Sequence, residues 1–176
     1  YEIPLRLVGS EMCIRDRYHN VVFVGFDKDG NPRHANKRGT GSTSTYKGNA
    51  VGSAPEYSFH WGGKSNRLYL FEAPIDMLSF ISMNKDGWRN HNYAASCSVS
   101  DKVLFQCLAD NPGIKKVSIC FDSDEPGQLA AQRITAKLVM QNIESEILVP
   151  VNKDWNEDLL CGDGLEVEQS CQILRR

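Results

Sequence analysis

The residues best suited to chemistry are acidic and follow short apolar runs. Asp122 and Asp124 come after residues 117–121, VSICF, in which apolar side chains alternate with Ser and Cys. Such alternation is typical of a β-strand, and residues two apart on an extended chain point the same way. Both carboxylates can therefore present oxygens to one hard cation such as Mg²⁺. Glu72 follows a second apolar run, residues 68–71, in the same manner.

The elements that position these acids alternate between strands and helices, with breaks at Pro, Gly and Asn. The expected strands are 68–71, 92–95, 116–121 and 144–149, and the expected helices are 74–83, 100–110 and 126–141. Repeated strand–helix units predict an α/β fold with a mainly parallel four-stranded sheet flanked by helices. Ligands of such folds lie beyond the carboxyl ends of the strands, where the acids fall.

A third acidic segment, residues 153–159 (KDWNEDL), follows the fourth expected strand. A plainer explanation of these acids is helix capping, because Asp and Glu are favoured at helix N-termini. Capping accounts for Glu125 and Asp158, but it needs one acid per helix, whereas Asp122 and Asp124 crowd one strand end. Adjacent carboxylates raise each other's pKa unless a cation neutralises them. The set therefore favours a divalent-metal site.

The preceding part of the chain is basic and is predicted to be rich in β-structure. Residues 18–66 carry six Lys and Arg against three Asp and Glu, whereas residues 67–176 carry eleven against sixteen. The run 21–26 predicts a strand, with 33–37 as its hairpin partner across turn-forming residues. A basic front before an acidic back is expected when one part holds a polyanion and the other a metal.

A loop rich in Gly, Ser and Thr, residues 39–52, follows this hairpin. Lone basic residues in loops are usually just solvated. The loop's amides and hydroxyls, with Arg38 and Lys47, would nonetheless suit contact with phosphates. Residues 62–66, GGKSN, include Lys64 and form the junction to the next part. They match only the tail of a phosphate-binding P-loop and precede a strand, so that assignment is rejected.

The bulk composition narrows the class of protein. The chain has 176 residues, 41% of them hydrophobic, and a net charge of −2, which suits one α/β domain with a small annex. No apolar run approaches the roughly 18 residues of a membrane helix, so no membrane partner is expected. The six cysteines lack CxxC and Cys/His ligand spacing, and no secretory signal precedes them. We expect reduced thiols, a cytoplasmic location and no zinc site in this chain.

Residues 7–17, LVGSEMCIRDR, resemble one reading frame of a transposase adaptor used in preparing sequencing libraries. We predict that residues 1–17 are a non-native sequencing-adaptor scar and that the native N-terminus is missing. The alternative is a genuine N-terminal strand, and adaptor-free resequencing would decide. The predicted organisation continues with a basic β-rich subdomain over 18–66, an α/β domain over 67–161 and a C-terminal tail over 162–176.

The three acidic segments together resemble the motifs of a known family. Residues 72–76 (EAPID), 121–131 (FDSDEPGQLAA) and 153–158 (KDWNED) are similar to the three acidic motifs of Toprim domains. The closest form is that of bacterial-type DNA primases and of Toprim proteins from conjugative and other mobile elements. The resemblance covers residue 67 to about residue 160. Residues 24–33 and 46–53 are more loosely similar to the basic subdomain that precedes this domain in primases.

The resemblance implies a role for each acid. Glu72 matches the acid of the first motif, which acts in acid–base chemistry or metal binding, and Asp76 is its catalytic companion. Asp122 and Asp124 match the Mg²⁺-binding pair. Asp154 matches a further metal-site acid, so the implied metal ligands are Glu72, Asp122, Asp124 and Asp154, with Mn²⁺ as an alternative ion.

Basic and neutral positions complete the expected site. Lys47 matches a basic residue that faces nucleic acid, and with Arg38 and Lys64 it forms the predicted nucleic-acid-binding set. Asn156 stands where primases commonly carry a second aspartate, which puts a second metal in doubt. Residues 94–97 stand where relatives often have a glycine-containing loop.

The implied function is primase-like nucleotidyl transfer, in which RNA primers are made from nucleotides on single-stranded DNA. We expect a fragment of a mobile-element replication protein that meets a replicative helicase or relaxase through missing regions. The zinc-binding and helicase-contacting domains of a primase do not fit in this chain. One alternative is a Toprim nuclease that cleaves phosphodiesters, and another is a non-catalytic DNA-binding accessory protein.

Overall fold

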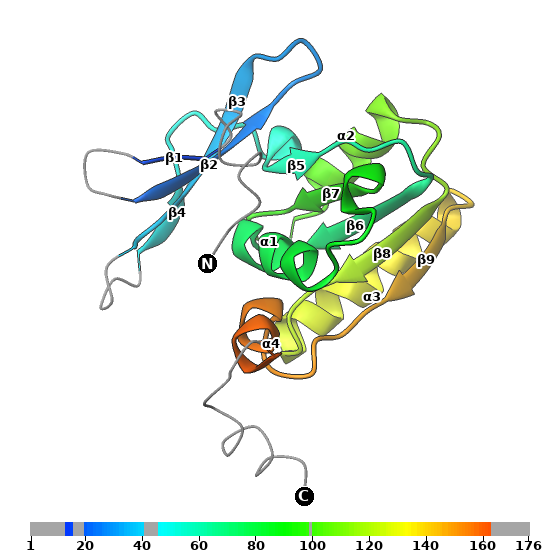
Figure 1. The fold of residues 1–176 in the computed structure, drawn as a ribbon. Helices are drawn as coiled ribbons and strands as arrows, with labels where there is room; N and C mark the ends of the chain where they lie inside the picture. Colours follow the sequence, from blue (N-terminus) through cyan, green and yellow to red (C-terminus); the bar gives the residue numbers. More distant parts are fainter. Residues whose placement is uncertain (1–12, 16–19, 41–45, 99, 163–176) are drawn as a thin grey trace, which may run out of the picture.

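Two β-sheets lie side by side in the part of the chain that the structure describes (Figure 1). The computed structural model describes residues 13–15, 20–40, 46–98 and 100–162. The first sheet is antiparallel, in the order β1 (Cys13–Arg15), β2 (Val21–Phe26), β3 (Pro32–Arg38), β4 (Lys47–Asn49). The second sheet has the order β5 (His60–Trp61), β7 (Asn92–Ala95), β6 (Arg67–Phe71), β8 (Lys116–Cys120), β9 (Glu144–Ile147).

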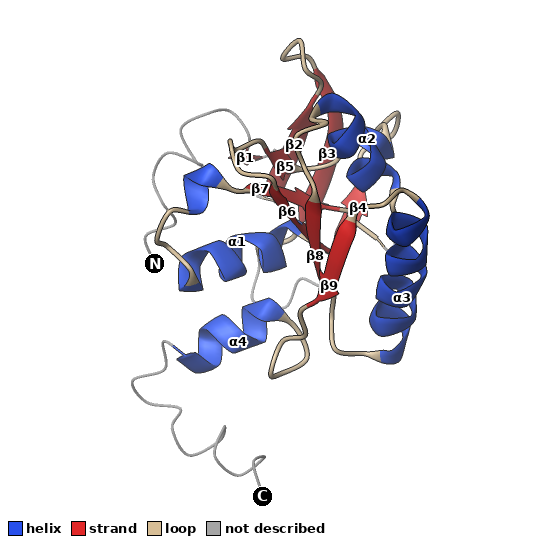
Figure 2. Ribbon diagram, turned by 90° about the vertical axis from the view of Figure 1, so that its right-hand side faces the viewer, coloured by secondary structure: helices blue, strands red, loops and turns tan. Residues whose placement is uncertain are grey.

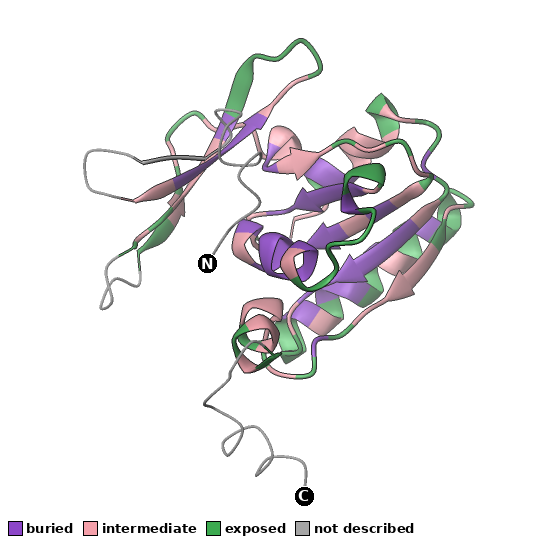
Figure 3. Cartoon of the chain, in the orientation of Figure 1, coloured by how far each residue is buried: buried purple, intermediate pink, exposed green. Residues whose placement is uncertain are grey.

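Helices cover both faces of the second sheet (Figure 2). They are α1 (Pro74–Met83), α2 (Lys102–Asp110), α3 (Glu125–Met140) and α4 (Trp155–Gly162), with 3₁₀ turns η1 (Pro55–Tyr57) and η2 (Trp88–Asn90). Leu68 and Leu70 of β6 face the core under α2 and α3, while Phe71 faces the core under α1. This alternation follows from the period of two in a strand, and Figure 3 shows the buried centre of the sheet.

The predicted α/β fold is confirmed, because β6, β7, β8 and β9 are parallel and alternate with helices along the chain. The predicted sheet of four strands is one strand short. Strand β5 pairs antiparallel with β7, through His60 opposite Ala94 and Trp61 opposite Tyr93. A two-residue strand has no alternation to read, so only its pairing reveals it. Among the described residues, no helix is long and apolar enough to cross a membrane.

The first sheet contains the predicted hairpin, in which β2 pairs antiparallel with β3. Strand β4 lies within the predicted loop of residues 39–52, whose residues 41–45 are outside the described part. Strand β1 lies within the predicted scar and pairs antiparallel with β2, which follows the scar. Residues 1–12 and 16–19 are outside the described residues, as are 163–176 of the predicted tail. The adaptor origin of residues 1–17 stays a prediction.

Strand β2 packs directly against the second sheet. Phe23 is 3% exposed and meets Phe59 edge-to-face at 5.3 Å between ring centroids. Burying a Phe side chain contributes about 1.5–3 kcal/mol. Two residues along β2, a Cβ on Gly25 would lie 1.8 Å from the carbonyl oxygen of Tyr57. The absence of a side chain at Gly25 therefore sets how closely β2 approaches the backbone at the end of η1.

We predict that Gly25→Ala lowers the free energy of unfolding by about 1–3 kcal/mol or more, because the new methyl group meets backbone that cannot move aside. Thermal and urea unfolding measure the effect. Gly62→Ala is the matched control, since a Cβ at Gly62 has no heavy atom within 4 Å among the described residues. Equal stability of the two variants would contradict the close approach.

Candidate active site

The acids of the first two motifs leave adjacent parallel strands at the same edge of the second sheet. Phe71 at the end of β6 pairs with Cys120 of β8. Glu72 directly follows Phe71, and Asp122 follows Cys120 by two residues. Both acids line one cavity of about 450 Å³. The structure therefore brings the carboxylates of Glu72 and Asp122 to the same cavity, as expected from the sequence.

This acidic cavity is closed by the first sheet. Its walls bring together acids of the second sheet and cations of both parts: Glu72, Asp76, Asp122, Asp154, Arg38, Lys47 and Lys153. Arg38 of β3 and Lys47 of β4 are cross-strand partners. The predicted metal-site acid Asp124 is not among the described lining residues, but its charge raises the pKa of both Glu72 and Asp122.

Lys64 lies away from the acidic cavity. Its amide donates to the carbonyl oxygen of Asn90 at 2.9 Å, just before the start of β7. Because β6 and β7 are parallel, this is the amino edge of the sheet, opposite to Glu72. The structure thus places Arg38 and Lys47 at the cavity, and Lys64 at the other edge.

Sequence reasoning missed several residues that line the acidic cavity. Lys153 is one of them, and its place directly before Asp154 in the third motif was a usable signal. Asn36 and Asn49 also line the cavity, where Asn36 Nδ2 donates to Asn49 Oδ1 at 2.8 Å. Their facing positions depend on the pairing of β3 with β4, which sequence reasoning did not predict.

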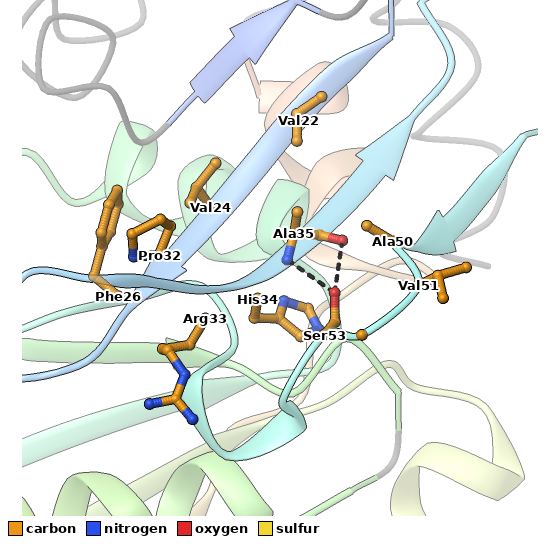
Figure 4. Close-up of a pocket in the computed structure, with 11 residues that line it drawn as sticks. Val22, Val24, Phe26, Pro32, Arg33, His34, Ala35, Ala50, Val51 and Ser53 are labelled. Atoms are coloured by element: carbon orange, nitrogen blue, oxygen red, sulfur yellow. Dashed lines mark hydrogen bonds between the residues drawn. The ribbon is translucent and has the colours of Figure 1, made fainter.

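A larger hollow, of about 620 Å³, lies elsewhere on the first sheet (Figure 4). It is lined mainly by apolar side chains, including Val22 and Val24, which alternate with Phe23 and so face away from the second sheet. Ser53 closes one side, where its hydroxyl accepts from the amide of Ala35 at 3.1 Å. No carboxylate is among the described lining residues, so this hollow contains none of the acids that the sequence singles out.

Helix capping explains part of the acidic set, but through different residues than predicted. Asp124 Oδ1 accepts the amide of Gly127 at 2.9 Å and caps α3, and Asp154 Oδ1 accepts the amide of Glu157 at 2.8 Å. Asp158, expected to be a cap, instead accepts the amides of the preceding loop at Val151 and Asn152. Each capping bond uses one oxygen of its carboxylate, so capping and cation binding are compatible.

The turn around Asp122 requires glycine at position 127. A Cβ there would lie 2.7 Å from the carbonyl oxygen of Asp122 and 3.1 Å from Asp124 Oδ1. Gln128 Nε2 donates to the same Asp122 carbonyl at 2.8 Å. The spacing Asp-x-Asp-x-x-Gly is therefore a packing requirement of this strand-to-helix turn.

Neighbouring backbone groups also hold the first motif. The amide of Ser96 donates to the carbonyl oxygen of Phe71 at 2.9 Å. The single Ser96 hydroxyl lies near the carbonyl oxygens of Phe71 at 3.2 Å and Glu72 at 3.4 Å, and nearest to that of Ser98. Asp76 is 4% exposed, and its Oδ1 accepts the amide of Asn156 at 3.4 Å. Asp76 is thus both a cavity wall and a contact between α1 and α4.

Cys97 lines the acidic cavity in a backbone conformation that glycine favours. Its φ is 56°, in the left-handed region that side chains rarely adopt. This gives a physical reason for the glycine-containing loop that relatives often have where this chain carries residues 94–97. Burial raises the pKa of the Cys97 thiol to about 12, so it is protonated at neutral pH.

Burial and mutual repulsion raise the pKa values of three acids. Burial, followed by the charges of Asp122 and Asp124, raises the pKa of Glu72 to about 6. Burial and the charges of Asp122 and Asp154 raise the pKa of Asp76 to about 7. Burial and the charges of Asp154 and Asp124 raise the pKa of Asp122 to about 6. Nearby Lys47, Arg38 and Lys153 oppose these shifts.

The donor set fits a hard divalent cation. Asp122 Oδ1 is buried and accepts no hydrogen bond from the described residues. A buried carboxylate oxygen that accepts no hydrogen bond and lies near other carboxylates is suited to coordinate a cation. Across the described ranges, no three acidic, His or Cys side chains converge as a ready ligand set. Mg²⁺ is commonly bound by one or two carboxylates together with water and substrate phosphates, which matches this arrangement.

Comparison with protein families identifies the acidic half of the chain. Residues 69–159 match the family model described as Toprim-like, which covers about half of the chain. The chain therefore belongs to the Toprim-like family. Residues 5–65 match a second model, a family of unknown function designated DUF3991. The two matches meet near the start of β6.

Two curated proteins are related in sequence. An uncharacterized protein of Bacillus anthracis, pXO2-78, is 24% identical in an alignment of 134 residues that covers 68% of this chain and 38% of that protein. The uncharacterized protein MG010 of Mycoplasma genitalium is 31% identical over 96 residues, which are 53% of this chain and 42% of that protein. The chain thus spans about two fifths of the length of these relatives.

Three of the solved structures with a similar fold come from primases. The DnaG catalytic core has a TM-score of 0.58 and 18% identity, over 91% of this chain and 55% of that one. The primase fragment of the bacteriophage T7 primase-helicase protein has a TM-score of 0.60 and 18% identity, over 86% and 62%. A DnaG primase catalytic domain bound to ssDNA has a TM-score of 0.59 and 17% identity, over 97% and 58%. At these identities the likeness concerns the fold.

The raised pKa values predict how stability depends on pH. Carboxylic acids in unfolded chains titrate near pH 4. Since the folded-state pKa values are about 6 or 7, the folded chain binds more protons than the unfolded chain between these limits. This stabilisation is complete below pH 4 and is lost as the pH rises through 6 to 7.

We therefore expect the metal-free chain, in EDTA, to have a lower melting temperature at pH 8 than at pH 5. Asp76→Asn should flatten this dependence, because its amide oxygen still accepts from Asn156 but the site no longer titrates. Asp86→Asn, at an exposed surface position, is the control and should follow the wild type. An undiminished pH slope in Asp76→Asn would contradict the electrostatic account.

Proposed function

We propose that this chain is the catalytic part of a Mg²⁺-dependent nucleic-acid enzyme that carries out primase-like nucleotidyl transfer. The observation that carries the proposal is the acidic cavity, which is lined by four carboxylates from the α/β part of the chain and by two cations of the first sheet. Carboxylates suit a divalent cation, while cations on a neighbouring strand pair suit phosphates. The likeness of the fold to primase catalytic cores supports the same reaction class.

Each side of the cavity has a distinct part in this proposal. Asp122 and Asp124 hold the cation, and Glu72 and Asp154 contribute the remaining carboxylate ligands. When bound, Mg²⁺ supplies Lewis-acid polarisation of the phosphate under attack and neutralises its charge. Arg38 and Lys47 orient the nucleic acid or the nucleotide phosphates through charge-assisted hydrogen bonds.

Glu72 is suited to proton transfer as well as to cation binding. Its pKa of about 6 lies near neutral pH, where a general base is most effective. In primer synthesis it would accept the proton of the attacking 3′-hydroxyl. In the alternative function, a Toprim nuclease, the same group would accept a proton from water.

The proposed partners are single-stranded DNA and nucleotides. A related DnaG catalytic domain is bound to ssDNA, and the T7 relative belongs to a primase-helicase protein. Because the chain spans 55–62% of these solved chains, contact with a helicase or relaxase would involve further regions. A replication role in a mobile element belongs to the same proposal.

We predict that Asp122→Asn lowers Mg²⁺-dependent incorporation of labelled ribonucleotides on single-stranded DNA at least about 100-fold, because the cation loses its central carboxylate. Glu144→Gln is the matched control. Glu144 lies on the edge strand β9 and forms a surface ion pair with Lys116 of the neighbouring strand β8. Full activity in Asp122→Asn, or an equal loss in Glu144→Gln, would refute the site.

A parallel assay with a labelled DNA strand distinguishes the candidate functions, because it detects cleavage and binding of the strand beside nucleotide incorporation. Incorporation supports the primase-like reaction. Mg²⁺-dependent cleavage without incorporation supports the nuclease. DNA binding with neither reaction supports the non-catalytic accessory protein.

We also expect Lys47→Met to weaken binding to single-stranded DNA and to reduce the slope of log affinity against log salt by about 0.7, the value for one phosphate contact. Fluorescence anisotropy across a salt series measures both. Lys64→Met is the matched control, because it removes the same charge at the opposite edge of the sheet. It should leave the slope unchanged. Equal effects of the two variants would mean that the acidic cavity is not where the strand binds.

A further inference from the structure

The turn formed by residues 153–156 is bonded to the strand end that carries Asp122. The carbonyl oxygen of Lys153 accepts the amide of Ser123 at 2.9 Å and its hydroxyl at 3.1 Å. Trp155 Nε1 donates to the carbonyl oxygen of Cys120 at 2.9 Å. Asp122 therefore lies between two backbone positions that the 153–156 turn holds.

The Trp155 side chain is fixed by aromatic packing. Its ring meets Phe80 of α1 edge-to-face at 5.0 Å and Phe71 of β6 at 6.4 Å between centroids. Phe71 directly precedes Glu72. The indole thus contacts the ends of both acid-bearing strands, through a hydrogen bond to β8 and a ring contact with β6.

The residues on either side of Trp155 reach the other acids. Asp154 lines the acidic cavity, and its Oδ1 caps α4 through the amide of Glu157. The amide of Asn156 donates to Asp76 Oδ1, and Asn156 Oδ1 accepts from Ser79 Oγ at 3.4 Å. The two Asn156 bonds restrict how the 153–156 turn can rotate relative to α1, whereas the Asp154 bond fixes the turn to the start of α4.

We infer that Trp155 is a positioning residue, whose indole fixes the spacing of Asp122 and Asp154 before a divalent cation binds. The inference rests on the proposed function only in requiring that these acids hold a cation. The physical reason is preorganisation: two carboxylates that repel each other would move apart unless the backbone behind them is held. The indole N–H and the Ser123 bonds hold that backbone from one side, and the aromatic packing holds it from the other.

The test is direct Mn²⁺ or Mg²⁺ binding to the full chain, measured by calorimetry and by Mn²⁺ electron paramagnetic resonance, for Trp155→Phe against wild type. Phenylalanine keeps an aromatic ring in the core but cannot donate to Cys120. We expect about tenfold weaker cation binding, as found when an outer hydrogen bond to a metal site is removed. Trp88→Phe is the matched control, because Trp88 lies in the same core but packs on Trp61.

Ser123→Ala provides a gentler second variant, since Ser123 is exposed and the change removes only the hydroxyl bond to Lys153. A loss of about two- to tenfold in cation affinity is expected for one hydrogen bond. Ser82→Ala is its control, because the Ser82 hydroxyl bonds Leu78 within α1. This variant keeps the inference testable if Trp155→Phe does not fold.

Wild-type affinity in a folded Trp155→Phe, or an equal loss in Trp88→Phe, would overturn the inference. If Trp155→Phe does not fold, wild-type affinity in Ser123→Ala would overturn it. So would a wild-type chain that binds neither ion at millimolar concentration. A wild-type chain that binds Mn²⁺ but makes no primers would sink the proposed reaction instead. Weaker Mn²⁺ binding by Trp155→Phe in that chain would still support the positioning role.

Discussion

Negative charge concentrated where β6 and β8 end is the constraint on which the rest of the structure depends. Glu72 and Asp122 leave neighbouring parallel strands at one edge, and burial with mutual repulsion raises both pKa values to about 6. Such a cluster is unfavourable unless cations lie close by. Arg38 and Lys47 supply positive charge from the opposite wall, so the two sheets are electrostatically complementary across the acidic cavity.

The antiparallel sheet is therefore part of the site as well as a neighbouring fold unit. Phe23 packs on Phe59, and Gly25 allows β2 to lie against the backbone of η1. This contact holds β2 against the α/β part of the chain, and β3 and β4 follow β2 in the same sheet. The two family matches divide the chain near residue 66, yet β5, which precedes that point, pairs within the second sheet. The cavity exists only where both parts are present.

Several side chains serve structure and site together. Asp124 and Asp154 each cap a helix with one oxygen, and Asp76 joins α1 to the amide of Asn156. Capping and cation binding were alternatives in the sequence, but one carboxylate has two oxygens and can do both. Trp155 also has two roles. Its ring packs against the core under α1, and its N–H donates to the carbonyl oxygen of Cys120 at the end of β8.

The local sequence was sufficient for the second sheet and for its acids. Alternating apolar residues with Pro and Gly at the breaks predicted four of its strands and three of its helices. The order of those elements predicted where Glu72 and Asp122 would meet, because parallel strands end at a common edge. The short strands β4 and β5 escaped prediction, since two or three residues have no period to read and form only by pairing with β3 and β7. Tertiary structure alone decided that Lys64 lies at the far edge while Lys47 faces the acids, because both are lone lysines beside glycines in the sequence.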